Sequence, residues 1–487
     1  MAINETPLWW YNQIIKEKRM SITKAKKIYF VGVGGIGMSA IARYTLTTGK
    51  EVAGSDLKSS AVTKQLEKEG IKINYSQVAE NITDDIDLIV YSASVPVSNP
   101  ELCVAKEKGI KTATYGEALG MIFNVKKGIA ICGTHGKSTV TAMTGAVLED
   151  GDLDPSVLVG SIVPRYQGNL RVGKGEIFVA EACEYRKNFI SLYPQIIALN
   201  NIELDHTDYY ENVEKMKDAF AEFCEHLPTN GVLFANGDSK ETREVAQRIQ
   251  TQKPNVQIFY FGKNNQNDFY FQNFETEKGK TIFDVFHQEK NLGKFVLKVP
   301  GEINALNALV AVAIGVYFGI DIQKIKMSLE NFSGIWRRFE VKGEYRGALI
   351  ISDYAHHPTA VKETLKAAKE FYPNKRIVAI FQPHQHNRLR GLYNDFVCAF
   401  DFADQIILSE IYDVTGREEK EDQNISSCDL ARDIEKHNPK LAGKVAYTEN
   451  LSETMQLIKE KVCSDDVVLI MGAGDIFEIA DELVKEK

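Results

Sequence analysis

The sequence predicts an α/β protein of three domains, each built on a mostly parallel β-sheet. Three observations predict this fold class. The chain has 487 residues, which corresponds to about three domains at ~150 residues each. Short apolar runs alternate with amphipathic helical stretches along most of the chain, and strands that alternate with helices indicate parallel sheets. Two of the apolar runs enter glycine-rich turns that are followed by a helix, a pattern that recurs in α/β domains.

The first domain is predicted over residues 1–125. The run "KIYFV" enters the turn "GVGGIG", and the helix after this turn ends at Gly49. Further strands are predicted in "EVAGSD" (51–56), "IDLIVYSASV" (86–95) and "IKTATY" (110–115). Because helices separate these strands, the domain is expected to be Rossmann-like, with one parallel, doubly wound sheet.

The second domain is predicted over residues 126–335. The strand "GIAICG" leads through a glycine loop into the helix "STVTAMTGAVLEDG", and "INALNALVAVAIGVYFG" predicts a later helix. Further strands are predicted in "EIFVAEA" (176–182), "QIIALNNI" (195–202), "GVLFANG" (231–237) and "VQIFYFG" (256–262). From about residue 267 to 300 polar and apolar residues alternate in hairpin-like runs, which predicts a small antiparallel sheet beside the mostly parallel one.

The third domain is predicted over residues 336–487 and is again Rossmann-like. Its strands are predicted in "ALIISD" (348–353), "RIVAIF" (376–381), "QIILSE" (405–410) and "DVVLIMGAG" (466–474), with helices between them.

Composition excludes several classes of function. The formal net charge of -8 argues against general binding to nucleic acid or to an anionic membrane, because both need a basic surface. No run approaches the ~20 apolar residues that span a bilayer. The seven cysteines lack C-x-x-C spacing, which indicates reduced thiols. We therefore expect a cytoplasmic enzyme.

The stretch "GTHGKST" resembles a phosphate-binding loop with a displaced first glycine. Gly136, Lys137 and Ser138 fit the end of the G-x-x-x-x-G-K-[ST] pattern, but Ile131 stands where its first glycine belongs, and the upstream glycine is Gly133. In a P-loop ATPase-like domain the backbone N–H groups would hold phosphate oxygens, Lys137 would reach the β- and γ-phosphates, and Ser138 would ligate Mg²⁺. The alternative is a glycine turn without a ligand.

The turn "GVGGIG" carries Gly32, Gly34 and Gly37 at G-x-G-x-x-G spacing, and Asp56 follows at the end of the next strand. This fingerprint favours a dinucleotide, with the acid on a ribose hydroxyl. An NAD-dependent dehydrogenase would explain it, but would leave the second glycine loop unused. Two phosphate-binding turns in separate domains are also consistent with two nucleotides, one of them a substrate.

Acids and histidines gather where predicted strands end, the edge at which open α/β sheets bind ligands. In the second domain these are Glu181, Glu184, Asn201, Glu203, Asp205, His206 and Asp208. In the third they are Asp353, His356, His357, His384, His386, Arg388 and Arg390. Arg388 could pair bidentately with a substrate carboxylate. The alternative for both groups is solvated surface side chains and helix caps.

Together these stretches resemble the Mur ligases, the ATP-dependent amide-forming enzymes of peptidoglycan synthesis, over about residues 26–480. The shortened loop with histidine is typical of one branch. The stretches that carry the resemblance are "VGVGGIGMSAIAR", "GSD", "NNIELDH", "SDYAHHPTAV", "FQPH" and "GAGDI". They are most similar to the branch that joins L-alanine to UDP-N-acetylmuramate. We expect the protein to be a monomer or a homodimer.

The resemblance implies a role for each matching residue. The first domain would hold the UDP-sugar with Gly34, Gly35, Gly37 and Asp56. The second would bind ATP through Gly133, Thr134, His135, Gly136, Lys137, Ser138 and Thr139, with Asn304 and Asn307 near the adenine and the active site. Glu181 and His206, with Ser138, would hold Mg²⁺. From the third domain Arg338 would reach the γ-phosphate, Asp353 would lie near the ribose, and Tyr354, His356, His384 and Arg388 would form the amino-acid pocket.

Three departures bear on specificity. Ser138 replaces a threonine, which keeps the hydroxyl. The stretch "EACEYRKNF" differs from the acidic type of the alanine-adding branch, and Gln385 stands where that branch usually carries arginine. The alternatives within the family are therefore ligases for glycine, for serine or for a recycled tripeptide. A sugar-nucleotide sensor without catalysis is the alternative from another class.

Overall fold

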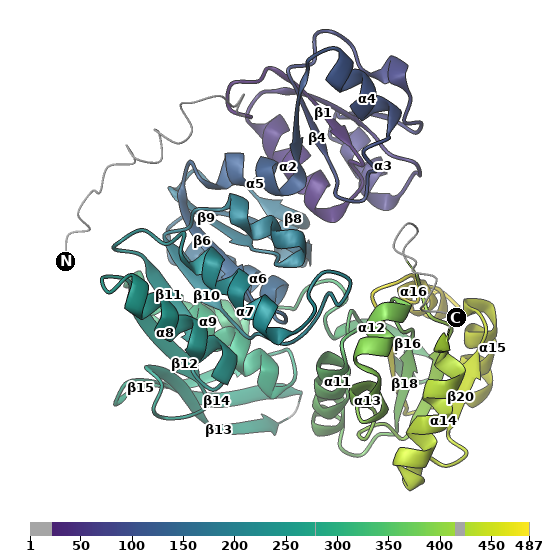
Figure 1. Ribbon diagram of the computed structural model, residues 1–487. Coiled ribbons are helices and arrows are strands. Elements are labelled where there is room, and N and C mark those ends of the chain that lie inside the picture. The colour runs from purple at the N-terminus through teal and green to yellow at the C-terminus, as the bar shows by residue number, and fades with distance from the viewer. Residues whose placement is uncertain (1–21, 278, 414–423, 487) are drawn as a thin grey trace. The chain divides into compact units, whose positions relative to one another are not determined.

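The computed structural model describes residues 22–277, 279–413 and 424–486 (Figure 1). The chain divides into two compact units. Of the described residues, the first unit comprises those from 22 to 127 together with Ser191–Tyr193, and the second comprises Gly128–Ile190 and those from Pro194 to 486. Among the described residues, no helix is long and apolar enough to cross a membrane.

The first unit contains a five-stranded sheet in the order β3-β2-β1-β4-β5, and every neighbouring pair is parallel. Its strands are β1 (Lys27–Val31), β2 (Glu51–Ser55), β3 (Lys72–Asn74), β4 (Leu88–Tyr91) and β5 (Lys111–Thr114). Its helices are α2 (Ile36–Thr47), α3 (Ala61–Lys68), α4 (Pro100–Glu107) and α5 (Tyr115–Phe123). This alternation confirms the parallel α/β arrangement predicted for the N-terminal part.

The second unit contains two sheets, of which the first has ten strands in the order β15-β14-β13-β12-β11-β10-β6-β9-β7-β8. The strands are β6 (Lys127–Cys132), β7 (Ser156–Val163), β8 (Gly168–Arg171), β9 (Ile177–Glu181), β10 (Ile196–Leu199), β11 (Val232–Asn236), β12 (Gln257–Gly262), β13 (Phe269–Glu277), β14 (Lys280–His287) and β15 (Lys290–Leu297). The antiparallel strands predicted for residues 267–300 are present. They extend the central sheet through a short parallel pairing of β12 with β13.

Two apolar helices pack together on the central sheet. They are α6 (Lys137–Asp150) and α9 (Glu302–Tyr317). Both are buried along most of their length and belong to one core cluster with the strands beneath them, so the helix that begins at the glycine loop is anchored along its whole length. The other helices of this part are α7 (Val213–Cys224), α8 (Lys240–Gln252) and α10 (Ile322–Glu330).

The C-terminal sheet has six strands in the order β16-β17-β21-β18-β19-β20, and only the β16–β17 pair is antiparallel. The strands are β16 (Glu340–Tyr345), β17 (Ala348–Asp353), β18 (Ile377–Phe381), β19 (Gln405–Ser409), β20 (Val445–Thr448) and β21 (Val467–Met471). The helices are α11 (Pro358–Phe371), α12 (His386–Gly391), α13 (Tyr393–Val397), α14 (Ser427–His437), α15 (Leu451–Lys461) and α16 (Phe477–Leu483). The predicted α/β class is thus confirmed for all three sheets.

Candidate functional site

The loop between β6 and α6 depends on two glycines. Gly133 and Gly136 have φ angles of +125° and +81°, in the region that favours glycine. A Cβ atom at Gly136 would lie 2.5 Å from Asn307 Oδ1, and one at Gly133 would lie 2.9 Å from the backbone N and O of Asn201. The loop therefore has no room for side chains at either position. Thr134, Ser138 and Thr139 are buried in and just after it.

Lys137 begins α6 and folds back over the loop. Its Nζ donates to Gly133 O at 2.6 Å and to Thr134 O at 3.0 Å, and it lies 3.0 Å from Glu184 Oε1. Burial alone would lower the pKa of the Lys137 ammonium, but the Glu184 carboxylate raises it above its usual value. Lys137 is therefore a cation at neutral pH, at the position where phosphates bind in loops of this kind.

Glu184 joins Lys137 to His206. His206 Nε2 lies 3.6 Å from Glu184 Oε1, and its ring centroid lies 4.7 Å from that of Tyr185. Burial would raise the pKa of Glu184, but Lys137 and then His206 lower it, so that it is ionised. Its Oε2 is buried and has no hydrogen-bond partner among the described residues. A buried carboxylate oxygen of this kind is suited to a cation or a donated hydrogen bond.

Glu181, at the end of β9, also lies beside the glycine loop, near Ser138 and Lys137. It accepts a hydrogen bond from the Gly160 amide. Burial raises the pKa of Glu181 despite a hydrogen bond from Ser138 and the nearby charges of Lys137 and Arg338. The oxygens of Ser138 and Glu181 suit Mg²⁺, which prefers oxygen ligands, and the imidazole of His206 adds a nitrogen next to the carboxylate of Glu184.

Helix α9 reaches the glycine loop with its first turns. Asn307 is the residue that crowds Gly136, and its Nδ2 donates to Asn304 Oδ1 at 3.1 Å. Asn304 in turn donates to Pro300 O at 2.7 Å. The structure thus brings Asn307 to the loop, with Asn304 one turn earlier.

Two adjacent arginines precede β16 and differ in environment. Arg337 is buried and donates to Gly472 O and Gly474 O, and its Cζ lies 4.4 Å from the centroid of Phe477. Burial lowers its pKa to about 10. Arg338 is half-buried and lies over Tyr354, with Cζ 5.0 Å from the ring centroid. Arg337 therefore stabilises the domain, whereas Arg338 remains the arginine suited to a ligand.

Asp353 lies at the end of β17, and both of its carboxylate oxygens accept hydrogen bonds from backbone amides. Oδ2 accepts from the Phe339 amide at 2.7 Å, and Oδ1 accepts from the Ala355 amide at 2.7 Å. Burial raises its pKa, which Arg338 partly offsets. Its carboxylate thus links the arginine loop to the histidine loop after β17.

Arg388 joins the C-terminal sheet to the central part. Its Nε donates to Asp205 Oδ1 at 2.8 Å, and its Nη1 lies 3.0 Å from His384 Nδ1. Burial would raise the pKa of Asp205, but the Arg388 guanidinium holds it well below its usual range. The sequence predicted that Arg388 faces a substrate carboxylate. In the structure the Nε side of its guanidinium already pairs with a carboxylate of the protein, that of Asp205.

His356 lies beside this pair. Its Nδ1 is 2.9 Å from Tyr354 O, and its ring centroid is 6.2 Å from that of His384. Because a carbonyl only accepts, Nδ1 carries the proton. Burial, with the Arg388 charge, holds the pKa of His356 well below its usual value, so that the ring is neutral and Nε2 is an acceptor, with no hydrogen bond to another described residue.

The position that departs from the alanine-adding pattern is buried. Gln385 is 5% exposed, has a φ of +67° and donates its backbone N–H to Tyr412 O at 2.8 Å. The stretch "EACEYRKNF" is held by two side-chain contacts. The Tyr185 hydroxyl donates to Asp208 Oδ2 at 2.9 Å, and Lys187 Nζ lies 2.5 Å from Glu222 Oε2. Burial raises the pKa of the Cys183 thiol to about 12, so this thiol is not a reactive thiolate.

In the first unit the glycine turn after β1 contacts Asp56, the acid that the sequence predicts for a ribose hydroxyl. Gly34 N donates to Asp56 Oδ2 at 2.8 Å, so part of the carboxylate serves the turn. Gly32 has a φ of +77°. A Cβ atom at Gly37 would lie 2.5 Å from the Tyr115 ring, and Gly35 is the N-terminal cap of α2. The turn is closely packed on both sides.

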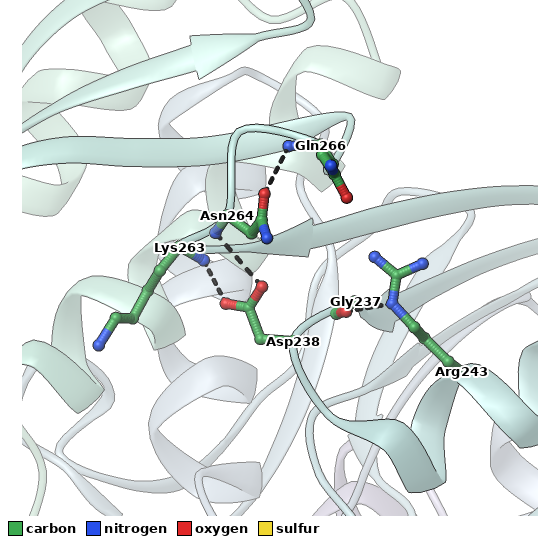
Figure 2. Close-up of a pocket in the computed structure, with 6 residues that line it drawn as sticks. All are labelled: Gly237, Asp238, Arg243, Lys263, Asn264 and Gln266. Carbon is green, nitrogen blue, oxygen red and sulfur yellow. Dashed lines mark hydrogen bonds between the residues drawn. The ribbon is translucent and has the colours of Figure 1, made fainter.

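A separate open pocket of about 550 Å³ lies at the ends of β11 and β12 (Figure 2). The sequence did not predict it. Its lining consists of Gly237, Asp238, Arg243, Lys263, Asn264 and Gln266. The Asp238 carboxylate accepts from the amides of Lys263 and Asn264, and Arg243 donates to Gly237 O. These bonds use the side chains of Asp238 and Arg243, and the Lys263 ammonium pairs with Glu302 Oε2 at 2.8 Å.

The structure thus brings together most of the predicted residues of the second unit. Two residues with central contacts were not assigned roles: Glu184, which pairs with Lys137, and Asp205, which pairs with Arg388. Their position at strand ends was the available signal, but their partners lie 47 and 183 residues away along the chain.

Comparisons with known families and proteins agree with this geometry. Profiles described as "Mur ligase family, catalytic domain", "Mur ligase middle domain" and "Mur ligase, glutamate ligase domain" match residues 27–127, 131–315 and 337–474. The UDP-N-acetylmuramate–L-alanine ligase of Caldanaerobacter subterraneus subsp. tengcongensis is 39% identical over 470 residues, which cover 96% of this chain and 99% of that protein. The protein of the same name from Clostridium kluyveri is 38% identical over 460 residues, which cover 94% and 98%.

Solved structures are similar over the same length. The UDP-N-acetylmuramate–alanine ligase of Thermotoga maritima has a TM-score of 0.79 and 28% identity, and the match covers 94% of this chain and 98% of that one. A murein peptide ligase from Psychrobacter arcticus has a TM-score of 0.69 at 21% identity and covers 94% and 98%, which shows a shared fold.

Proposed function

The chain belongs to the Mur ligase family, and we propose that it uses ATP to join L-alanine to the lactyl carboxylate of UDP-N-acetylmuramate. The product is an amide, formed through an acyl phosphate, and the reaction serves peptidoglycan precursor synthesis. The relatives of this name that match nearly the whole chain support the substrates.

One observation in the structure carries the proposal. The phosphate-type loop of the central sheet and the histidine–arginine rim of the C-terminal sheet lie against each other, joined by the Arg388–Asp205 pair at 2.8 Å. A ligase needs ATP phosphates and the incoming amine at one place, because the activated carboxylate must meet the amine before water. An NAD-dependent dehydrogenase would use neither of these two features.

We assign the nucleotide to the loop from Gly133 to Thr139, with Asn304 and Asn307 near the adenine and Asp353 near the ribose. Lys137 and Arg338 would offset negative charge on the γ-phosphate as the lactyl carboxylate attacks it. Ser138, Glu181 and His206 would hold Mg²⁺. When bound, this ion neutralises charge on the phosphate oxygens.

We assign the amino acid to Tyr354, His356, His384 and Arg388. His356 is neutral and carries its proton on Nδ1, so its Nε2 is suited to accept a hydrogen bond from the amino group of the amino acid and to orient it. The second Nη of Arg388 would face the amino-acid carboxylate. The UDP-sugar pyrophosphate is assigned to Gly34, Gly35, Gly37 and Asp56.

We also propose three domains with boundaries near residues 125 and 335, a cytoplasmic location and a monomeric or homodimeric state. The change of sheet after α10 supports the second boundary.

The experiment that tests the function is phosphate release by the purified protein with ATP, Mg²⁺ and UDP-N-acetylmuramate. L-Alanine, glycine, L-serine and the tripeptide L-alanyl-γ-D-glutamyl-meso-diaminopimelate are supplied one at a time. We expect release with L-alanine, and mass spectrometry should show the matching amide. Release only with another acceptor would keep the ligase chemistry and contradict the proposed amino acid. No release with any of them would contradict the ligase itself.

Lys137→Ala tests the assignment of two nucleotide sites. We expect turnover to fall by at least about 10²-fold, because a preorganised charge at the γ-phosphate is lost. Binding of UDP-N-acetylmuramate, measured by calorimetry without ATP, should stay within about twofold of wild type. Loss of that binding would contradict the assignment of the UDP-sugar to the first unit.

A further inference from the structure

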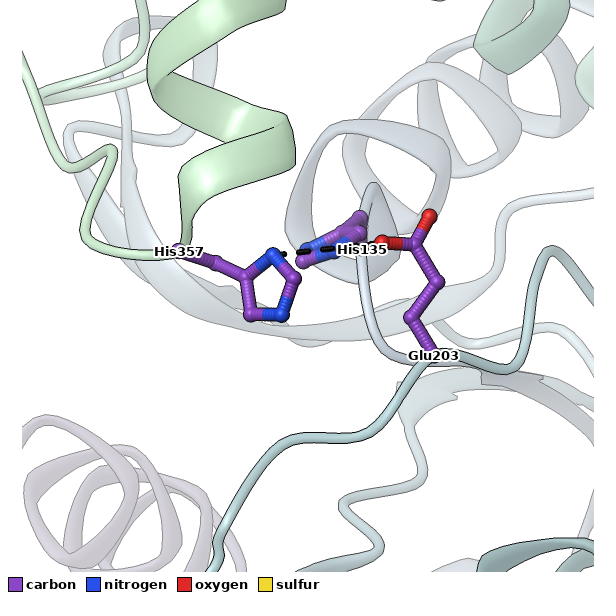
Figure 3. Close-up of side chains that lie close together, drawn as sticks. All are labelled: His135, Glu203 and His357. Atoms are coloured by element: carbon purple, nitrogen blue, oxygen red, sulfur yellow. Dashed lines mark ion pairs between the residues drawn. The ribbon is translucent and has the colours of Figure 1, made fainter. Parts of the chain in front are cut away.

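A cluster of metal-ligand type lies next to the phosphate loop, in residues to which the proposed reaction gives no metal. It consists of His135 in the loop, Glu203 after β10 and His357 before α11 (Figure 3). His135 Nε2 lies 3.4 Å and His357 Nδ1 lies 3.9 Å from Glu203 Oε2, and all three atoms lie within 4.8 Å of one another. Figure 3 shows the three side chains converging from separate segments.

These separations are close to those of a coordination shell. In a tetrahedral site with bonds of about 2.0–2.1 Å, ligand atoms lie about 3.3 Å apart. The two distances to Glu203 exceed this by about 0.1 and 0.6 Å, and the two histidine nitrogens lie within 4.8 Å of each other. Side-chain rotation would have to bring the three atoms together around one ion. Three protein ligands leave one corner for water, a common arrangement for Zn²⁺.

The hydrogen bonds around the cluster orient its ligands. His357 Nε2 lies 3.1 Å from Leu204 O, which only accepts, so Nε2 carries the proton and Nδ1 has the lone pair. In the structure Nδ1 accepts a long hydrogen bond from the Thr359 amide at 3.3 Å, which a bound ion would replace. Metal-binding histidines usually donate their other N–H to a carbonyl in this way. The Thr359 hydroxyl donates to Glu203 Oε2 at 2.6 Å and holds the carboxylate in place.

The third ligand atom has no competing partner. His135 Nε2 is buried and has no hydrogen-bond partner among the described residues. The His135 ring centroid lies 4.7 Å from that of His357, so the imidazoles face the same space.

We propose that His135, Glu203 and His357 form a binding site for a divalent transition-metal ion, with Zn²⁺ the best match. Two imidazole nitrogens and one carboxylate oxygen select such an ion over Mg²⁺, which prefers oxygen. The bound ion would connect the phosphate loop directly to the start of α11. The site uses none of the residues assigned to Mg²⁺, and its test does not depend on ligase activity.

Co²⁺ titration of the full-length protein tests the proposal, since Co²⁺ replaces Zn²⁺ and absorbs in visible light when tetrahedral. Nucleotide is left out because ATP chelates the ion. We expect visible bands that saturate at one equivalent, disappear on addition of Zn²⁺ and persist in excess Mg²⁺. Since the site contains no thiolate, the near-ultraviolet charge-transfer band of a cobalt–sulfur bond should be absent.

Three variants and one matched control assign the signal. His135→Asn, Glu203→Gln and His357→Asn should each weaken Co²⁺ binding at least tenfold; asparagine at 357 can still cap α11. His437→Gln is the control, because His437 also lies near a carboxylate and a thiol, 3.6 Å from Asp401 Oδ1 and 4.0 Å from Cys398 Sγ. It should bind Co²⁺ as wild type does.

Absence of visible bands in the wild type, or bands lost only in His437→Gln, would overturn the proposal. So would a thiolate charge-transfer band. Melting curves measured without metal show whether each variant is folded. Only the folded variants are used to judge the proposal. Anomalous scattering at the zinc edge from wild-type crystals gives a second measurement that needs no variant, and a peak elsewhere would also overturn the assignment.

Discussion

Arg388 and Asp205 illustrate at the scale of single residues how charge is held inside this protein. Both side chains are 5% exposed. Among the described residues, each is the charge partner of the other, and the adjacent His206 is a second one for Asp205 at 3.9 Å. Removing one member of such a pair leaves an uncompensated buried charge, which typically destabilises a fold by about 3–5 kcal/mol. We expect Arg388→Ala to destabilise the protein on this scale and to raise the KM for the amino acid more than the KM for ATP.

The pH dependence of stability tests this pair. Asp205 has a folded pKa well below its usual value, so its contribution is fully present above the unfolded pKa of about 3.9 and is lost as pH falls toward the folded pKa. The difference in free energy of unfolding between wild type and Asp205→Asn should be constant from pH 7 to about pH 5 and shrink below about pH 4. Urea unfolding at each pH measures it, and a difference that grows toward acid would contradict the assignment.

Residue types and spacing were enough to propose a phosphate loop at Gly133–Thr139, but not to predict the side-chain pairs around it. Lys137 was predicted from the loop pattern, whereas its pairing with Glu184 depends on where the chain after β9 turns back. Likewise, sequence does not decide which of Arg337 and Arg338 faces inward. The φ angles of +55° at Arg337 and +48° at Phe339 set that choice, and such angles are rare outside glycine and poorly signalled by sequence.

At the scale of elements, the junction of β6 and α6 depends on backbone shape. Gly136→Ala would place a methyl group 2.5 Å from Asn307 Oδ1 at a φ of +81°, so we expect loss of ATP binding and destabilisation beyond the roughly 1–2 kcal/mol of a left-handed alanine. Gly319→Ala is the matched control, with a φ of +72° and nothing within 4 Å. Calorimetric ATP titration and thermal melts compare the two. Equal effects would show that backbone strain alone is at work.

The elements themselves were largely predictable. The run "ALIISD" coincides with β17, Ala348–Asp353, because a short, mostly apolar run bounded by turns leaves few alternatives. The edge strands β16 and β20 were not predicted, since exposed edge strands lack that apolar signal. The pairing that adds β13–β15 to the central sheet involves two residue pairs and is set by tertiary packing, which sequence alternation does not encode.

At the scale of the whole molecule, contacts between the central and C-terminal sheets should control the fate of the activated carboxylate. Thr359 donates to Glu203 across this junction at 2.6 Å. We expect Thr359→Val to loosen the junction and admit water, so that phosphate released per amide formed rises by about twofold or more. Phosphate and amide are measured in the same reaction. Thr359→Ser keeps the hydroxyl and should retain the wild-type ratio; an increase there as well would contradict the hydrogen bond as the cause.

The two backbone contacts of Asp353 have a consequence for how amino-acid specificity can change during evolution. Its carboxylate ties the loop of Arg338 to the loop of His356 through the Phe339 and Ala355 amides. Under the proposed assignments, a substitution at Asp353 would therefore disturb the residue assigned to the γ-phosphate and a residue assigned to the amino acid together. A change of amino-acid specificity alone is then expected at positions that Asp353 does not connect. Gln385, on the separate loop that follows β18, is such a position.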